Sequence, residues 1–155
     1  MLETTVSSIP REIDFPLQTR WPLDRPIHVL LIEDNPEQAE WTAMALNDGA
    51  AGERFDVEWV SSLLAGMSRL RDRGCDVVLL DLGLPELDGH GSHTAIRIAD
   101  SKVPVVILTS DQDPGTRRLI MEGGACEYLL KPETDAGALR LAVTRAMGSR
   151  PERPS

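Results

Sequence analysis

Side chains that can carry out chemistry stand directly after four short apolar runs of this sequence. If these runs are parallel strands of one sheet, their carboxyl ends meet at the same edge. Three carboxylates, one hydroxyl and one ammonium then face one crevice. The residues are Glu33 and Asp34, Asp81, Thr109, and Lys131, which is followed by Pro132.

Three carboxylates in one crevice need compensating positive charge. A pair of them about 4 Å apart costs about 4 kcal/mol at an effective dielectric constant of about 20. Lys131 supplies one positive charge, and a divalent cation would supply two more. Ligand sets made only of oxygen favour Mg²⁺, and the sequence has no cluster of Cys and His with zinc spacing. We therefore expect Mg²⁺ as the cofactor.

Such a crevice suits phosphoryl transfer. A carboxylate can act as the nucleophile and form an aspartyl phosphate, while a metal, an ammonium and a hydroxyl stabilise charge on the phosphoryl oxygens. Asp81 is the best nucleophile candidate because it ends a central strand, ahead of the flexible Gly83. A lone Asp after a strand is usually a turn residue, but Asp34, Thr109 and Lys131 in register argue against that interpretation.

The elements that would position these residues alternate along the chain. Five short, mostly apolar runs alternate with five stretches of helical periodicity. Right-handed crossovers then predict an α/β, doubly wound fold, in which a five-stranded parallel sheet has helices on both faces. The expected strands are 27–32, 55–60, 76–80, 103–108 and 126–130, with the polar run 55–60 nearer the sheet edge.

Local signals mark several helix ends. Asn35 followed by Pro36 is typical of an N-cap and a first helical residue, and this helix is expected to end near Gly49. Gly123 and Gly124 are expected to close the helix that contains 116–121. The other expected helices lie between 63 and 74, at 92–99 and at 134–147. The residues expected to face the core are Ala39, Ala43, Met44, Leu46, Leu63, Leu64, Met67, Leu70, Leu139, Val143 and Met147.

Composition narrows the class of protein. The chain has 155 residues, of which 41% are hydrophobic, so that a single packed domain is expected. Its net charge of −9 argues against nonspecific binding to nucleic acid or anionic lipid. The sequence shows neither a membrane span nor a secretory signal. Cys75 and Cys126 are too few for a disulfide framework, so we expect a cytoplasmic protein with reduced thiols.

The chain divides into three parts by composition. Residues 1–26 contain four prolines and no sustained periodicity, and are interpreted as a flexible arm that Phe15 and Trp21 could anchor. Residues 27–147 form the domain, and 148–155 are expected to be a disordered tail. We expect the chain to act as a free-standing protein, with a fragment of a longer regulator as the alternative.

Taken together, the motifs resemble the receiver domain of two-component response regulators. They are Glu33-Asp34, DVVLLDLGLPELDG around Asp81, VPVVILTS around Thr109, and GACEYLLKP, which ends in Lys131 and Pro132. The resemblance covers about residues 27–147. It implies a flavodoxin-like sheet of strand order 2-1-3-4-5.

The resemblance also implies roles for the site residues. Asp34, Asp81 and the backbone carbonyl of Gly83 would bind Mg²⁺, and Glu33 would act through metal-bound water. Thr109 and Lys131 would contact the phosphoryl oxygens, and the Lys131–Pro132 bond would be cis. The phosphoryl donor would be a phosphohistidine of a sensor kinase or phosphotransfer protein.

The family's switch implies a further pair of residues. Thr109 would move toward the phosphoryl group, and Tyr128 would rotate into the space that it leaves. The fourth helix, fifth strand and fifth helix would then change their contacts with a downstream protein or a second copy. Two departures from the commonest pattern, Gly83 and Asp111, are expected to tune the lifetime of the phosphorylated form.

Other functions are less well supported by the sequence. A pseudo-receiver that takes no phosphate is disfavoured by the intact acids, Thr109 and Lys131. An aspartate-dependent phosphatase typically has a second Asp two residues after the nucleophile, where this chain has Gly83. His90 and His93 lie near Asp88, but without a further clustered ligand we interpret them as surface residues rather than metal ligands.

Overall fold

The computed structural model describes residues 25–48 and 54–148. Within these residues five parallel strands form one sheet of order β3-β2-β4-β5-β6. Numbered along the chain, this order is 2-1-3-4-5, so the predicted fold class and topology are confirmed. The strands are β2 (Ile27–Ile32), β3 (Phe55–Val60), β4 (Val77–Leu80), β5 (Val105–Thr109) and β6 (Glu127–Leu130).

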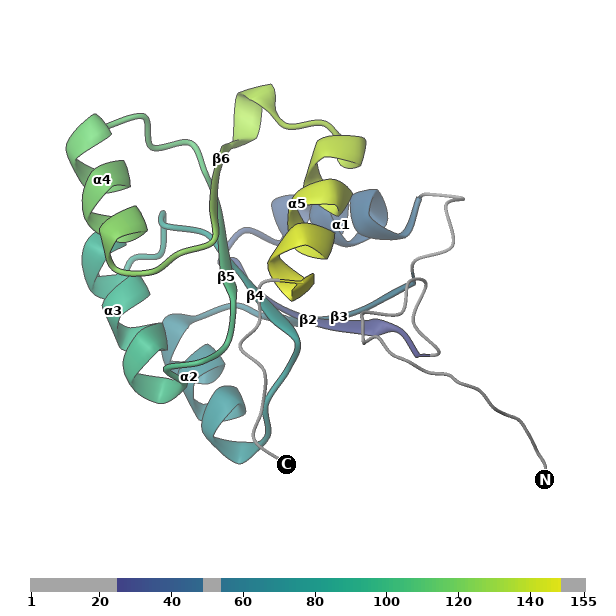
Figure 1. Ribbon diagram of the computed structural model, residues 1–155, viewed down its shortest axis with the longest axis horizontal. Coiled ribbons are helices and arrows are strands. Elements are labelled where there is room, and N and C mark those ends of the chain that lie inside the picture. Colours follow the sequence, from purple (N-terminus) through teal and green to yellow (C-terminus); the bar gives the residue numbers. More distant parts are fainter. Residues whose placement is uncertain (1–24, 49–53, 149–155) are drawn as a thin grey trace, which may run out of the picture.

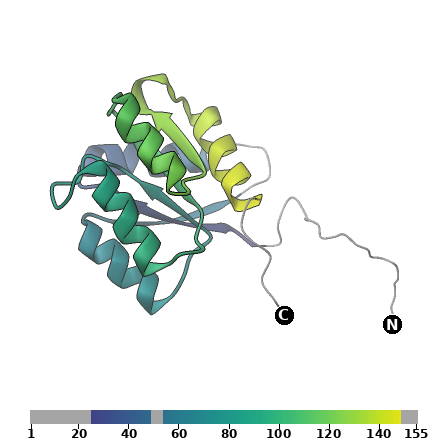
Figure 2. The same cartoon turned by 60° about the vertical axis from the view of Figure 1, so that its left-hand side comes forward.

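Helices cover both faces of this sheet. Figure 1 shows α1 and α5 on one side of the strands and α2, α3 and α4 on the other, and the turned view in Figure 2 shows the same layers. This division leaves the strand ends open, where loops carry the polar residues. The helices are α1 (Pro36–Asn47), α2 (Leu63–Asp72), α3 (Gly89–Ala99), α4 (Pro114–Glu122), the short 3₁₀ turn η2 (Lys131–Glu133) and α5 (Ala136–Gly148).

The strands supply two separate cores because their side chains alternate between the faces. Val29 and Leu31 of β2 pack with α1 and α5, whereas Leu30 and Ile32 pack in the core that α2, α3 and α4 cover. The central strands β4 and β5 are buried along their whole length. The more polar run 55–60 forms the edge strand β3, as predicted.

Side chains of short polar residues begin most of the helices. Asn35 accepts hydrogen bonds from the amides of Glu37 and Gln38, so it is the N-cap that the sequence predicts ahead of Pro36. At the start of α2, the carboxylate of Glu86 accepts a hydrogen bond from the Leu63 amide, N···O 3.0 Å. Glu86 belongs to the loop after Asp81, so this loop is fastened to α2.

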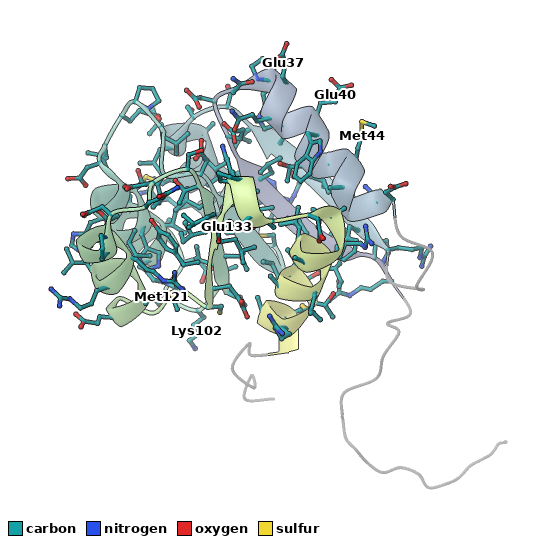
Figure 3. The ribbon with its side chains drawn as sticks, turned by 90° about the horizontal axis from the view of Figure 1, so that it is seen from above. Glu37, Glu40, Met44, Lys102, Met121 and Glu133 are labelled. Atoms are coloured by element: carbon teal, nitrogen blue, oxygen red, sulfur yellow. The ribbon has the colours of Figure 1, made fainter. Side chains whose placement is uncertain are left out.

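Two predicted core residues are exposed. Met44 of α1 has 63% of its surface exposed and Leu64 of α2 has 69%. Figure 3 shows Met44 on the outer side of α1, together with Glu37 and Glu40. In α1 the inward stripe consists of Ala39, Thr42, Ala45 and Leu46. The prediction that Met44 and Leu64 face the core is wrong, because their positions on the helices direct them toward solvent.

Element ends also differ slightly from the prediction. Cys126 precedes β6 instead of beginning it, and neither Cys126 nor Cys75 forms a disulfide. α5 begins at Ala136 because Asp135 accepts a hydrogen bond from the Ala138 amide, O···N 2.8 Å, and residues 131–133 form η2. The expected helix end near Gly49 lies outside the described residues, and α1 ends at Asn47.

The predicted arm, residues 1–26, lies outside the described residues except for Arg25 and Pro26, and the predicted tail, 148–155, except for Gly148. Arg25 is fixed to the domain: its guanidinium donates to both oxygens of Asp76, at 2.7 and 3.1 Å. Asp76 also accepts from the His28 amide, so this carboxylate joins the starts of β2 and β4. Among the described helices, none is long and apolar enough to cross a membrane.

His93 is buried, contrary to the prediction of a surface histidine, whereas His90 is exposed as expected. The ring of His93 packs beside Gly123 at the end of α4, where a Cβ would stand 3.3 Å from ring atoms. Glycine therefore makes room for the imidazole between α3 and α4. Burial lowers the pKa of His93 to about 4, and the nearby Arg97 adds to this effect.

We expect acid to destabilise the fold through His93. The unfolded residue has a pKa of about 6.5, so between about pH 6.5 and 4 the unfolded chain binds a proton that the folded chain does not. His93 therefore costs no stability above this range, and the free energy of unfolding falls as the pH drops through it, by about 2 kcal/mol at about pH 5.

Urea unfolding at about pH 7 and about pH 5 measures this loss. His93→Leu should remove about 2 kcal/mol of the pH dependence, whereas His90→Leu, at an exposed position of the same helix, should retain it. An equal loss in wild type and His93→Leu would contradict the prediction.

Candidate functional site

The register of the sheet brings the predicted acids together. β2 and β4 pair with Ile32 opposite Leu80, so the next residues, Glu33 and Asp81, leave the sheet side by side. The Asp81 amide extends this pairing by donating to the Ile32 carbonyl, N···O 3.0 Å. Carboxylate oxygens of Glu33, Asp34 and Asp81 lie within 4.8 Å of one another.

Lys131 places its ammonium between two of these acids. Its Nζ lies 3.0 Å from Glu33 Oε1 and 3.5 Å from Asp81 Oδ1. The same group donates to the side-chain carbonyl of Gln38 on α1. Within the described residues, Lys131 is the only cation at ion-pair distance from the three acids, so the cluster retains net negative charge.

Glu33 shows the electrostatic effect of this crowding. Its side chain is buried, and the pKa of Glu33 is raised to about 7, first of all by this burial. The hydrogen bond with Asp81 and the charge of Asp81 contribute to the increase, whereas the Asn35 amide and Lys131 oppose it. The carboxyl of Glu33 therefore ionises less readily than an exposed glutamate.

Asp81 is buried at the floor of a hollow of about 400 Å³. Its Oδ1 accepts a hydrogen bond from the Gly83 amide at 3.1 Å. A Cβ at Gly83 would lie 3.4 Å from Asp81 Oδ2, in ordinary contact. Any side chain at position 83 would therefore begin directly over the Asp81 carboxylate. The hollow is lined by Glu33, Asp34, Asn35, Gln38, Asp81, Leu82, Gly83, Thr109, Ser110, Asp111 and Lys131.

Thr109 ends β5 on the wall of the same hollow, where it is buried. Its Oγ1 accepts a hydrogen bond from the Asp111 amide at 3.1 Å. Because that contact uses an oxygen lone pair, the hydroxyl proton can be donated to an anion in the hollow. Asp111 also lines the hollow, and its Oδ1 accepts from the Asp113 amide at the start of α4.

Tyr128 connects β6 to the Thr109 loop. Its hydroxyl donates to the backbone carbonyl of Asp111 at 2.9 Å, and the ring is buried. The guanidinium carbon of Arg117 lies 5.4 Å from the ring centroid, within the range of a cation–π contact. Burial raises the pKa of Tyr128 above its usual value, so the hydroxyl remains a donor.

The structure therefore gathers Glu33, Asp34, Asp81, Thr109 and Lys131 at one edge of the sheet, with Gly83 and Asp111 on the rim. Pro132 lies in η2. That the bond before Pro132 is cis, and that the Gly83 carbonyl binds a metal, stay predictions.

Sequence reasoning missed two residues that contact this site. Gln38 accepts from Lys131, and the Trp59 indole Nε1 donates to the backbone carbonyl of Glu33 at 2.6 Å. Gln38 could have been identified from the sequence, because it stands three residues after the predicted N-cap Asn35. Trp59, on a polar edge strand 26 positions from its partner, carried no such signal.

The residues present fit a hard divalent cation. Three carboxylates lie within 4.8 Å of one another, with one ammonium beside them, and the described hollow offers only oxygen donors besides Lys131 and amide nitrogens. Such a ligand set suits Mg²⁺. Asp34 and Asp81 would hold it, with Glu33 behind them.

The sequence matches the response regulator receiver domain over residues 29–144. It is 36% identical over 104 residues to the DNA-binding response regulator MtrA of Mycolicibacterium smegmatis, covering 67% of this chain and 43% of that protein. The transcriptional activator protein IrlR of Burkholderia pseudomallei is 33% identical over 106 residues, which cover 68% and 44%. The chain thus spans less than half the length of these curated relatives.

Solved structures agree with this match. A response regulator receiver domain protein from Clostridium thermocellum has a TM-score of 0.69 at 28% identity, covering 79% of this chain and 94% of that one. A CheY-like receiver domain protein from Methanospirillum hungatei has a TM-score of 0.70 at 15% identity, covering 80% and 95%. The second likeness is one of fold alone.

We expect Mg²⁺ to stabilise the fold through the acid cluster. At a concentration about tenfold above its Kd, the free energy of unfolding should rise by about 1.4 kcal/mol, because only the folded chain presents the three acids together. Thermal unfolding with and without MgCl₂ measures this gain. Asp34→Asn should abolish most of it, whereas Glu122→Gln, an exposed acid of α4, should leave it unchanged. A gain of equal size in Asp34→Asn would place the cation elsewhere.

Proposed function

Because the chain belongs to the response regulator receiver family, we propose that it accepts a phosphoryl group on Asp81 from a phosphohistidine. A sensor kinase or phosphotransfer protein would carry that histidine. The observation that supports this most strongly is the convergence of three acids and Lys131 in one open hollow. The domain is of a signalling type rather than a classical enzyme, and its own chemistry would be limited to phosphoryl transfer and self-dephosphorylation.

In the proposed reaction an oxygen of Asp81 attacks the phosphorus. An O–P bond forms, the P–N bond to the donor imidazole breaks, and the released imidazole nitrogen keeps the electron pair and takes up a proton. Lys131, already 3.5 Å from Asp81, neutralises charge on the phosphoryl oxygens. The hydroxyl of Thr109 donates a hydrogen bond to one of them. Bound Mg²⁺ would supply further charge stabilisation beside Asp81.

A second hollow supports the proposed donor. It measures about 440 Å³ and lies between α1 and η2, where Trp41 and Pro132 provide apolar walls. It shares Gln38, Ser110 and Lys131 with the acid hollow. A donor helix seated there would place its phosphohistidine over Asp81, which lies otherwise buried below the surface.

The proposed output uses the link between Thr109 and Tyr128. Movement of Thr109 toward the phosphoryl group would pull on the Asp111 amide, whose neighbouring carbonyl holds the Tyr128 hydroxyl. Tyr128 would then change position, and the face formed by α4, β6 and α5 would bind a downstream protein or a second copy. Phosphorylation shifts the population of this face rather than building a new fold.

Two alternatives bear on the same site. A pseudo-receiver would keep the fold without taking phosphate, and a fragment of a longer regulator would pass the signal to another domain. DNA binding appears in the names of longer relatives such as MtrA, of which the match covers 43%. We favour a phosphorylated receiver that signals by protein contact without itself binding DNA or membrane. A cytoplasmic location is part of this proposal and agrees with Cys75 and Cys126 forming no disulfide.

Incubation with acetyl phosphate and MgCl₂ should add the mass of one phosphoryl group to the wild-type chain. Asp81→Asn should add none, because an amide cannot act as the nucleophile, whereas Asp72→Asn, an exposed Asp at the end of α2, should react as wild type does. Intact-mass spectrometry reads all three. An unmodified wild-type chain would favour the pseudo-receiver.

Gly83→Arg should lengthen the lifetime of the phosphorylated form. Its side chain would begin 3.4 Å from Asp81 Oδ2 and shield the phosphoryl group from water that Asp111 orients. Gly74→Arg is the matched control, because a Cβ there meets no atom within 4 Å. Phosphoprotein decay followed by mass spectrometry should be slowed at least about tenfold, a barrier change of about 1.4 kcal/mol, in the first variant alone. An unchanged half-life would disprove the role of the open position.

A further inference from the structure

Trp59 reaches the acid site from the edge of the sheet. In the register of β2 and β3 it stands opposite Leu31, and its side chain therefore lies on the face that α1 and α5 cover. Its side chain is only partly covered, with 44% of the residue exposed. Despite this exposure, the indole Nε1 lies 2.6 Å from the backbone oxygen of Glu33.

Edge strand β3 holds both polar groups of the Glu33 backbone. The Glu33 amide donates to the Val60 carbonyl at 3.1 Å, which extends the pairing of β2 with β3. The Glu33 carbonyl lies beyond the last strand pair and accepts from Trp59 instead. The two neighbouring residues of β3 thus fix the chain at the point where it leaves the sheet.

The carbonyl of Glu33 and the amide of Asp34 belong to one planar peptide group. Holding the carbonyl oxygen therefore restricts rotation of this plane, and with it the direction of the Cα–Cβ bond of Asp34. Glu33 does not need this restraint for its side chain, whose carboxylate accepts from Lys131 and from the Asn35 amide.

Asp34 depends on its backbone more than Glu33 does. Its carboxylate is exposed, and no hydrogen-bond donor or ion-pair partner reaches it from the part of the chain that the structure describes. Nevertheless, one of its oxygens lies within 4.8 Å of oxygens of Glu33 and Asp81. The backbone must therefore hold the Asp34 carboxylate in this position, because side-chain contacts do not.

We propose that Trp59 is a positioning residue, which directs the carboxylate of Asp34 into the acid cluster by its hydrogen bond to the Glu33 carbonyl. This inference rests on the proposed function and deepens it, because the aligned carboxylate is the one that would hold the divalent cation with Asp81. Trp59 itself touches neither the cation nor the phosphoryl group.

Removal of the indole donor tests the proposal. Trp59→Phe in the full chain should raise the Kd for Mg²⁺ by about three- to tenfold, the effect of one hydrogen bond. Asn47→Ala at the far end of α1 is the matched control, because it also removes a side-chain hydrogen bond to a backbone carbonyl, that of Ala43, and should retain the wild-type Kd. Amide chemical-shift titration by NMR with MgCl₂ measures Kd in every variant. An unchanged Kd in Trp59→Phe would overturn the proposal.

A double-mutant cycle separates positioning from general destabilisation. If Trp59 acts through Asp34, Trp59→Phe should weaken Mg²⁺ binding much less when Asp34 is already Asn. Equal weakening in both backgrounds would show that Trp59 acts by another route and would overturn the inference.

A measurement on the unaltered chain does not depend on any variant folding. The Trp59 indole hydrogen of the metal-free protein should exchange with solvent at least about tenfold more slowly than that of Trp41, because only the first is bonded to a carbonyl. Equal exchange would also overturn the inference. Failure of the proposed function is distinguishable, since the wild type would then bind no Mg²⁺ at Asp34 and Asp81 while the slow indole exchange persisted.

Discussion

The site depends on one electrostatic imbalance, three carboxylates facing a single ammonium. Glu33 and Asp81 are brought together because the apolar strands β2 and β4 pair in the core. Lys131 follows the edge strand β6 and reaches both acids from there. The fold therefore provides the free energy that holds like charges close, and the net negative charge of the cluster favours the binding of a cation. The pKa of Glu33 is raised mainly because the carboxyl is buried, and the hydrogen bond and charge of Asp81 add to this effect.

The fold and the chemical centre were predictable because they follow from strong local signals. Buried central strands read as continuous apolar runs, and the carboxyl ends of parallel strands must meet at one edge. If the runs ending at residues 32, 80 and 130 are parallel strands, Glu33, Asp81 and Lys131 lie at the same edge of the sheet. The start of α1 was also predictable, because the N-cap Asn35 accepts hydrogen bonds from amides only two and three residues further along the chain.

Contacts between distant surfaces were not predictable in the same way. Met44 and Leu64 are apolar but exposed, and His93 is polar but buried, because helix rotation and the absence of a Cβ at Gly123 decide burial there. The hydrogen bond from Trp59 to Glu33 joins an edge strand to the loop after its neighbour. No periodicity or motif encodes such a bond; it requires the twist of the sheet and the rotamer of one side chain.

The two contacts of Tyr128 have a consequence for how sharply the proposed switch would respond. One hydrogen bond to the Asp111 carbonyl and one contact with Arg117 together contribute on the order of 1–2 kcal/mol. A gap of that size leaves about 3 to 16 per cent of the molecules in the other arrangement before any signal arrives. The domain would therefore have a basal output before any signal arrives, and phosphorylation would increase this output.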